Sequence, residues 1–169
     1  MKHGSLLMAL FLTLASSAVS AQGAAPVETD AQKFVRMTRS LEADPLMDTD
    51  KSMRTWMMRW TADSPDVYVL VCDLLGPIPK EKVPHGGELL TQYMFGNAAF
   101  QIEHPKQAKD KHAVQIAGVR SALKAYAAIL KKEASARIPY WDDLLAKDRA
   151  GKLDQHLHGR IDTACTRKE

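Results

Sequence analysis

The fold is decided by residues 88–103, with the sequence ELLTQYMFGNAAFQIE. Wound into a helix of 3.6 residues per turn, this stretch has apolar side chains on nearly every side. They are Leu89, Leu90, Tyr93, Met94, Phe95, Ala98, Ala99, Phe100 and Ile102. Because a helix that is apolar all round is buried among other elements, we expect residues 88–103 to form the centre of a helical bundle.

Segments on both sides of this central helix predict six more helices. Thr29 is suited to cap the first of them, Pro45 to end it and Gly151 to separate the last two. The predicted helices span residues 30–43, 49–62, 65–76, 109–134, 140–149 and 153–163. The longest predicted loop, residues 76–87, is rich in proline and glycine. The predicted fold class is all-α, with about seven helices in a single-domain orthogonal or bundle-like array.

The segment at 65–76 carries two opposed signals. Its apolar run, Val67–Val71, consists largely of β-branched residues, which favour strands. Ser64 as a cap, Pro65 in the first turn and Asp66 at the positive end of the dipole favour a helix instead. We predict a helix that ends near Gly76.

The first 21 residues predict a secretory signal peptide. Lys2 supplies a positive start, Leu6–Ala15 an apolar run and Val19–Ala21 a cleavage point. The apolar run is shorter than the roughly 20 residues that cross a bilayer, so no transmembrane anchor is expected. After cleavage near Ala21, residues 22–28 form a flexible lead and residues 29–169 a single helical domain. The predicted location is periplasmic or secreted.

Composition narrows the class of protein. Hydrophobic residues make up 46% of the chain and charged residues 25%, which are the proportions of a folded globular domain. The formal net charge is only +3, and the basic side chains alternate with acidic ones as on a solvated helix face. No basic stripe with interleaved aromatic residues is present, so no nucleic-acid partner is expected. No cofactor motif is present either, and the oligomeric state stays open.

Cys72 and Cys165 are the two cysteines of the chain. Export would place them in an oxidising compartment, so we expect a disulfide bond between them. The alternative is a pair of separate buried thiols that pack as small apolar side chains.

Several stretches between about residues 50 and 155 resemble those of an uncharacterised family of exported bacterial helical proteins. The stretches are Ser64–Val67 with Cys72, Glu88–Leu90 with Gln92, Ala98–Phe100, Ile102–Pro105, Ala117–Val119, Tyr126 and Asp142–Leu145. That family has no established activity. The resemblance therefore implies export and a helical fold, and it assigns no site residue.

Two groups of polar residues invite comparison with catalytic and metal sites, and only the first supplies weak catalytic candidates. Glu103 and His104 end the central helix, and Asp110 and His112 follow a few residues later. A carboxylate beside an imidazole can act as acid and base, although a histidine at a helix carboxyl end also has a purely structural use. His156 and His158 point in different directions on a helix, so we expect no metal site from them.

The second predicted helix carries methionine and tryptophan at Met53, Trp56, Met57 and Trp60, spaced as one apolar face. The face is suited to core packing, and a part left open would form a groove for a peptide or apolar ligand. Thioether sulfurs also suit Cu(I).

The functional expectation is an exported soluble domain without enzyme activity, which binds a protein, such as an envelope protein, or supports an envelope process. The alternatives are a small exported enzyme that uses Glu103 and His104, and a methionine-rich copper-binding protein.

Overall fold

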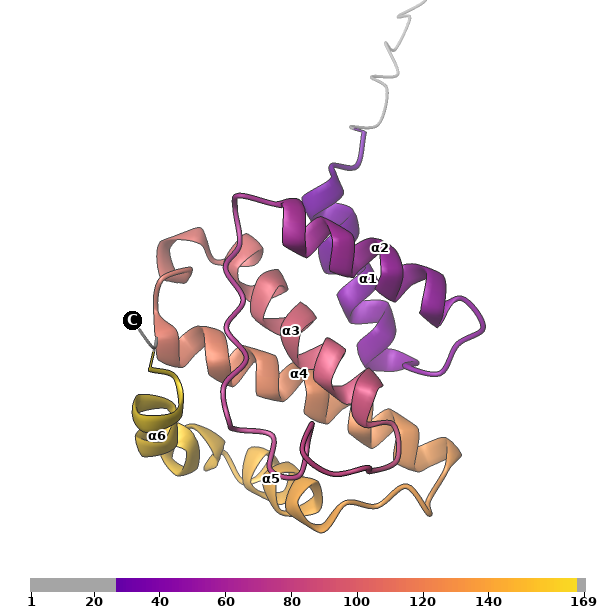
Figure 1. Ribbon diagram of the computed structural model, residues 1–169, viewed down its shortest axis with the longest axis vertical. Helices are drawn as coiled ribbons and strands as arrows, with labels where there is room; N and C mark the ends of the chain where they lie inside the picture. Colours follow the sequence, from indigo (N-terminus) through magenta and orange to yellow (C-terminus); the bar gives the residue numbers. More distant parts are fainter. Residues whose placement is uncertain (1–26, 167–169) are drawn as a thin grey trace, which may run out of the picture.

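The computed structural model describes residues 27–166, which fold into six α-helices without a β-strand (Figure 1). A short 3-10 helix, Pro105–Gln107, lies between the third and fourth of them. The predicted signal peptide and most of the predicted flexible lead lie outside the described residues. The helices are α1 Asp30–Ala43, α2 Asp50–Asp63, α3 Gly86–Glu103, α4 Lys111–Lys132, α5 Pro139–Arg149 and α6 Leu153–Ala164.

The all-α prediction is confirmed. In the described part of the chain, none of the helices combines the length and the apolarity that a membrane crossing requires. The helix count is six rather than about seven, because one predicted helix is absent.

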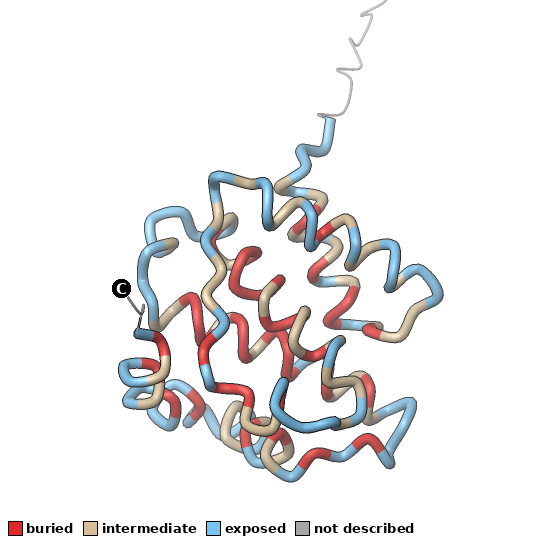
Figure 2. The backbone as a smooth tube through the Cα atoms, viewed as in Figure 1, coloured by how far each residue is buried: buried red, intermediate tan, exposed pale blue. Residues whose placement is uncertain are grey.

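Helix α3 lies at the centre of the molecule, as the sequence predicts. Half of its residues are buried, and α4 runs back across it (Figure 2). The crossing is close because Gly96 of α3 and Gly118 of α4 have no side chains. The polar residues Gln92, Asn97 and Gln101 are also buried on α3. They therefore need hydrogen-bond partners, which for Gln92 and Gln101 include groups outside α3.

Two apolar cores flank α3. The first core joins α3 to α4, α5 and α6, with Trp141 and Tyr126 among its fully buried side chains. The second core lies between α3 and the helical pair α1 and α2, and its buried members are Phe34, Leu41, Met57, Phe95, Ala98 and Ala99. Each core covers a different side of α3, which explains why the sequence of α3 has no polar face.

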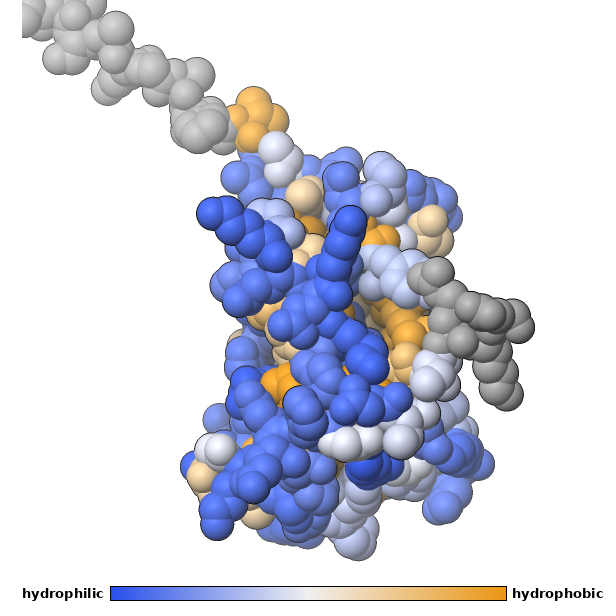
Figure 3. All heavy atoms as spheres, turned by 90° about the vertical axis from the view of Figure 1, so that its left-hand side faces the viewer, coloured by the Kyte–Doolittle hydropathy of each residue, from blue (hydrophilic) through white to orange (hydrophobic). Residues whose placement is uncertain are grey.

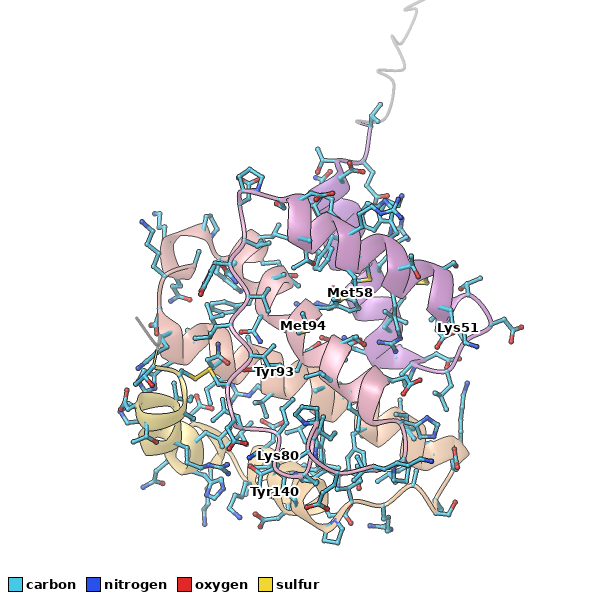
Figure 4. All side chains as sticks on the ribbon, in the orientation of Figure 1. Lys51, Met58, Lys80, Tyr93, Met94 and Tyr140 are labelled. Carbon is cyan, nitrogen blue, oxygen red and sulfur yellow. A yellow bond between two sulfur atoms is a disulfide. The ribbon has the colours of Figure 1, made fainter. Side chains whose placement is uncertain are left out.

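The predicted disulfide between Cys72 and Cys165 is confirmed. The two Cα atoms lie 5.1 Å apart, and the bond joins residues separated by 93 positions. It ties the end of α6 to the segment that crosses the front of α3 and α4 (Figure 4).

The prediction of a helix over residues 65–76 is wrong. Residues 67–72 are extended, and turns follow them as far as Lys80. The hydroxyl of Ser64 accepts the N–H of Asp66 at 3.3 Å, so the expected helix cap forms a local turn instead. Side chains of α3 and α4, which are distant in sequence, hold the main chain of residues 67–72 in an extended form.

Candidate functional site

The extended segment, residues 67–72, is held by side chains of α3 and α4 in the way that a neighbouring strand would hold it. The amide of Gln101 accepts the Tyr68 N–H at 3.0 Å and donates to the Tyr68 carbonyl, also at 3.0 Å. The Gln115 amide donates to the Leu70 carbonyl at 3.2 Å. These bonds satisfy the main chain on the inward side of the segment.

Tyr93 completes this support from α3. Its hydroxyl lies 3.4 Å from both the Leu70 carbonyl and the Cys72 N–H, and it donates to the amide oxygen of Gln115 (Figure 4). Burial raises the pKa of the Tyr93 phenol to about 12, because the anion would lose its hydration. The phenol therefore keeps its proton for the bond to Gln115 into more alkaline solution than an exposed tyrosine would.

The outward side of the extended segment has no such support. Within residues 27–166, no hydrogen bond reaches the main-chain groups of Val67, Val69 or Val71. In an extended chain the main-chain groups of successive residues point in opposite directions. Because those of Tyr68 and Leu70 point at α3 and α4, those of Val67, Val69 and Val71 point away from the body of the protein. The segment thus presents one open strand edge.

The segment lies along the seam between the two cores. The side chains of Val67 and Val69 pack against the second core, and Leu70 packs against the first. Val71 is 45% exposed and Tyr68 57% exposed. Apolar side chains therefore border the open edge, and hydrogen bonds to α3 and α4 anchor the segment that carries it.

A groove of about 460 Å³ runs between this segment and the first turns of α4. Val67, Leu70 and Val114 supply apolar walls, and Lys109 and Lys111 supply exposed positive charge. Lys111 forms an ion pair with Asp162 at 3.1 Å, whereas Lys109 has no ion-pair partner among the described residues. Asp66 is the one acidic residue of the lining.

Hydrophobic surface on one side of the molecule occurs in small areas among hydrophilic residues (Figure 3). A partner that binds there must therefore satisfy main-chain and charged groups as well as cover apolar side chains.

The four weak catalytic candidates each contact a different residue. Glu103 forms an ion pair with Arg39 at 2.5 Å, and the ring of His104 lies 4.6 Å from that of Phe100. Asp110 caps α4 by accepting the N–H of Ala113. His112 contacts Asp162 of α6. Within the described chain, no side-chain hydrogen bond or ion pair joins any two of the four candidates.

The residues Met53, Trp56, Met57 and Trp60 pack into the second core. Met57 is fully buried, and the Trp60 ring lies 4.7 Å from that of Phe34. Trp56 is stacked on Trp60 and is covered by the ammonium of Lys33, 4.2 Å from its ring centre. This arrangement corresponds to the core-packing alternative for the methionine and tryptophan face.

A second groove, about 510 Å³ in volume, lies between α1, α4 and α6. Its cationic side chains are paired: Lys124 contacts the nearly buried Glu42 at 3.0 Å, and Arg120 contacts Asp148 and Asp154. The hydroxyl of Ser121 donates to the same Glu42 carboxylate at 2.8 Å. Most of the charge in this groove is thus neutralised within the protein.

Sequence reasoning missed Gln101 and Gln115, which shape the candidate site. The available signal was an amide side chain inside an otherwise apolar helix, since a buried amide needs partners. The identity of those partners depends on which segment crosses the helix.

No family model matches the chain, and neither the curated proteins nor the solved structures contain a match to it. The resemblance to an exported bacterial family stays a prediction. The candidate site therefore rests on geometry alone.

Proposed function

We propose that this protein is an exported interaction domain without enzyme activity, which binds an extended segment of a partner protein along Val67–Val71. The observation that carries the proposal is the row of main-chain groups at Val67, Val69 and Val71, which have no hydrogen bond within residues 27–166. A peptide strand that pairs with this edge would satisfy them, as in other cases of strand addition. Each bond formed in this way contributes about 0.5–1.5 kcal/mol net.

The fixed position of the edge supports this function. The bonds from Gln101, Gln115 and Tyr93 hold the segment extended before any partner arrives, and the Cys72–Cys165 bond anchors its end. A preformed edge avoids the entropic cost of ordering the segment on binding. The partner alone then loses conformational freedom.

The groove beside the edge indicates the chemistry of the partner. Its apolar walls suit aliphatic side chains at alternate positions of the bound strand. Lys109 and Lys111 outnumber Asp66 in the lining and favour a carboxylate on the partner. We infer an extended, mainly aliphatic segment with one acidic side chain, carried by a protein of the same exported compartment, such as an envelope protein.

The experiment uses a library of seven-residue peptides in which Val and Thr alternate, and each peptide is made with and without one Asp. Fluorescence anisotropy measures their binding. We expect the peptides with Asp to bind more tightly. N-methylation of the bound peptide at successive positions should abolish binding at alternate residues only, because every second N–H of a paired strand faces its partner.

Two variants locate the bound peptide on the protein. Lys109→Glu should weaken binding of the Asp-containing peptide by about tenfold, the equivalent of one lost charge contact of about 1.4 kcal/mol. Lys51→Glu, an exposed lysine on α2, is the matched control and should leave binding unchanged. Absence of binding across the library, or N-methyl effects without a two-residue period, would contradict the proposal. So would turnover of an ester or peptide substrate that Glu103→Ala or His104→Ala abolishes.

A further inference from the structure

Three potential metal ligands from two helices meet at the surface beside the second groove. His112 belongs to the first turn of α4, and His158 and Asp162 lie one turn apart on α6. Their ligand atoms all lie within 4.8 Å of one another. This cluster contains no residue of the open strand edge, although Lys111, which lines the groove beside that edge, pairs with Asp162.

The distances suit a single ion. His112 Nε2 lies 2.8 Å from Asp162 Oδ1, and His158 Nε2 lies 4.0 Å from Asp162 Oδ2. Two ligands of a tetrahedral zinc ion, each about 2.0–2.1 Å from the metal, are about 3.3 Å apart. The two separations involve different oxygens of Asp162 and fall on either side of that value, so rotations of the carboxylate and of the His158 ring would be needed to bring the ligands to it.

The side chains are free to make those rotations. The exposed fractions of the side chains are 30% for His112, 68% for His158 and 51% for Asp162. The two imidazole rings are stacked, with centres 4.2 Å apart and planes inclined by 26°. Because the lone pair of an imidazole lies in the plane of its ring, the exposed His158 ring has to turn about its side-chain bonds before both nitrogens can face one ion.

We propose that His112, His158 and Asp162 bind a divalent transition-metal ion, with Zn²⁺ as the best fit. Two imidazole nitrogens and one carboxylate oxygen form a ligand set that Zn²⁺ accepts, with water in the fourth position. Ions that prefer all-oxygen ligands, such as Mg²⁺ and Ca²⁺, are excluded by the same ligand set. The bound ion would fasten α6 to α4 near the disulfide at Cys165.

The Asp162 carboxylate already contacts a cationic side chain and an imidazole: Lys111 Nζ and His112 Nε2 both lie within hydrogen-bond distance of its Oδ1. Lys111 is also a competitor, because its ammonium lies 3.1 Å from Asp162 Oδ1 and would have to move when a metal ion binds. Removal of the Lys111 charge should therefore strengthen metal binding.

The test is isothermal titration calorimetry of tag-free, disulfide-bonded protein with ZnCl₂, and with MgCl₂ as the contrast. We expect one Zn²⁺ per chain, no binding of Mg²⁺ and a rise in Tm with zinc. His158→Ala and Asp162→Asn should each weaken the zinc affinity by about tenfold or more, and Lys111→Gln should increase it. Because His158 and Asp162 are exposed, these variants should fold, and circular dichroism checks that they do.

Matched controls exclude unspecific binding to surface histidines. His156→Ala and His104→Ala replace exposed histidines outside the cluster and should leave the zinc affinity unchanged. The proposal is overturned if zinc releases no heat and leaves Tm unchanged, or if these controls weaken binding as much as His158→Ala does. Failure of the peptide experiment would leave this result unaffected, since the two sites share no ligand atom.

Discussion

Gly96 of α3 lies directly against Gly118 of α4: a Cβ added to Gly96 would be 3.1 Å from the Cα of Gly118. The two main chains approach this closely because neither residue has a side chain. The contact sets the position of α4 on α3, and both helices supply side chains that hold the extended segment.

Replacement of either glycine should therefore destabilise the protein. In Gly118→Ala the new Cβ would lie 2.1 Å from the Asn97 amide nitrogen and 2.8 Å from the Tyr93 carbonyl oxygen. We expect the free energy of unfolding to fall by about 1–3 kcal/mol, as for other overpacked sites. Gly159→Ala on α6 is the control, because no atom lies within 4 Å of its added Cβ. Urea denaturation should show that this control is as stable as the parent or more so.

Loss of the disulfide should lower stability substantially. Cys72→Ser and Cys165→Ser should each reduce the free energy of unfolding by about 2–5 kcal/mol, since the bond closes a loop of 93 positions. The double variant should lose nearly the same amount, because either single change already removes the bond. Denaturation curves of the three variants check this. Additive losses would show that the two sulfurs act separately.

The Gln101 amide should control the order of the extended segment. In Gln101→Leu, the N–H and carbonyl of Tyr68 lose their bonds to the Gln101 amide, and about 1–3 kcal/mol of stability is expected to be lost. Hydrogen exchange measured by mass spectrometry should accelerate over residues 67–72 more than in α5. Gln107→Leu, at an exposed glutamine, supplies the control. Equal exchange in both variants would mean that the amide does not hold the segment.

Alkaline pH should destabilise the fold through Tyr93. Its pKa is about 12 in the folded protein and about 10 in an unfolded chain, so the unfolded state releases the proton first. The contribution of this pKa difference to the free energy of unfolding is about 3 kcal/mol. It is fully present below pH 10 and is lost as the pH rises to 12. The stability of Tyr93→Phe should be lower at neutral pH and should decrease less over this interval. Stability curves at pH 9–12 compare the two proteins.

The sequence predicted the central helix and its surroundings because its signals were local. Residues 88–103 are apolar on all sides whatever they contact, and Thr29 caps the first helix through a bond that spans three residues. The segment after Ser64 was mispredicted because its local capping residues form only a turn. Bonds from Gln101 and Gln115, more than 30 residues away, determine its conformation. No pattern within the segment encodes them.

The candidate sites were less predictable for the same reason. Sequence reasoning compared His158 with His156, its neighbour along α6. The structure places His158 beside His112, which belongs to another helix. Helical spacing alone brings His158 near Asp162, whereas the third ligand depends on how α4 packs against α6. The open edge at Val69 follows from the inward hydrogen bonds of Tyr68 and Leu70, which the sequence of the segment does not encode.

The bond between Cys72 and Cys165 closes a covalent ring that contains α3, α4, α5 and α6 and leaves α1 and α2 outside it. A force that pulls on the two ends of the chain is therefore carried across the sulfur bridge and bypasses the helices inside the ring. Only α1, α2 and the extended segment that follows them can be drawn out while the bridge is intact. If the two ends of this chain were attached to structures that move apart, the second core would unfold first, and the helices inside the ring would stay folded.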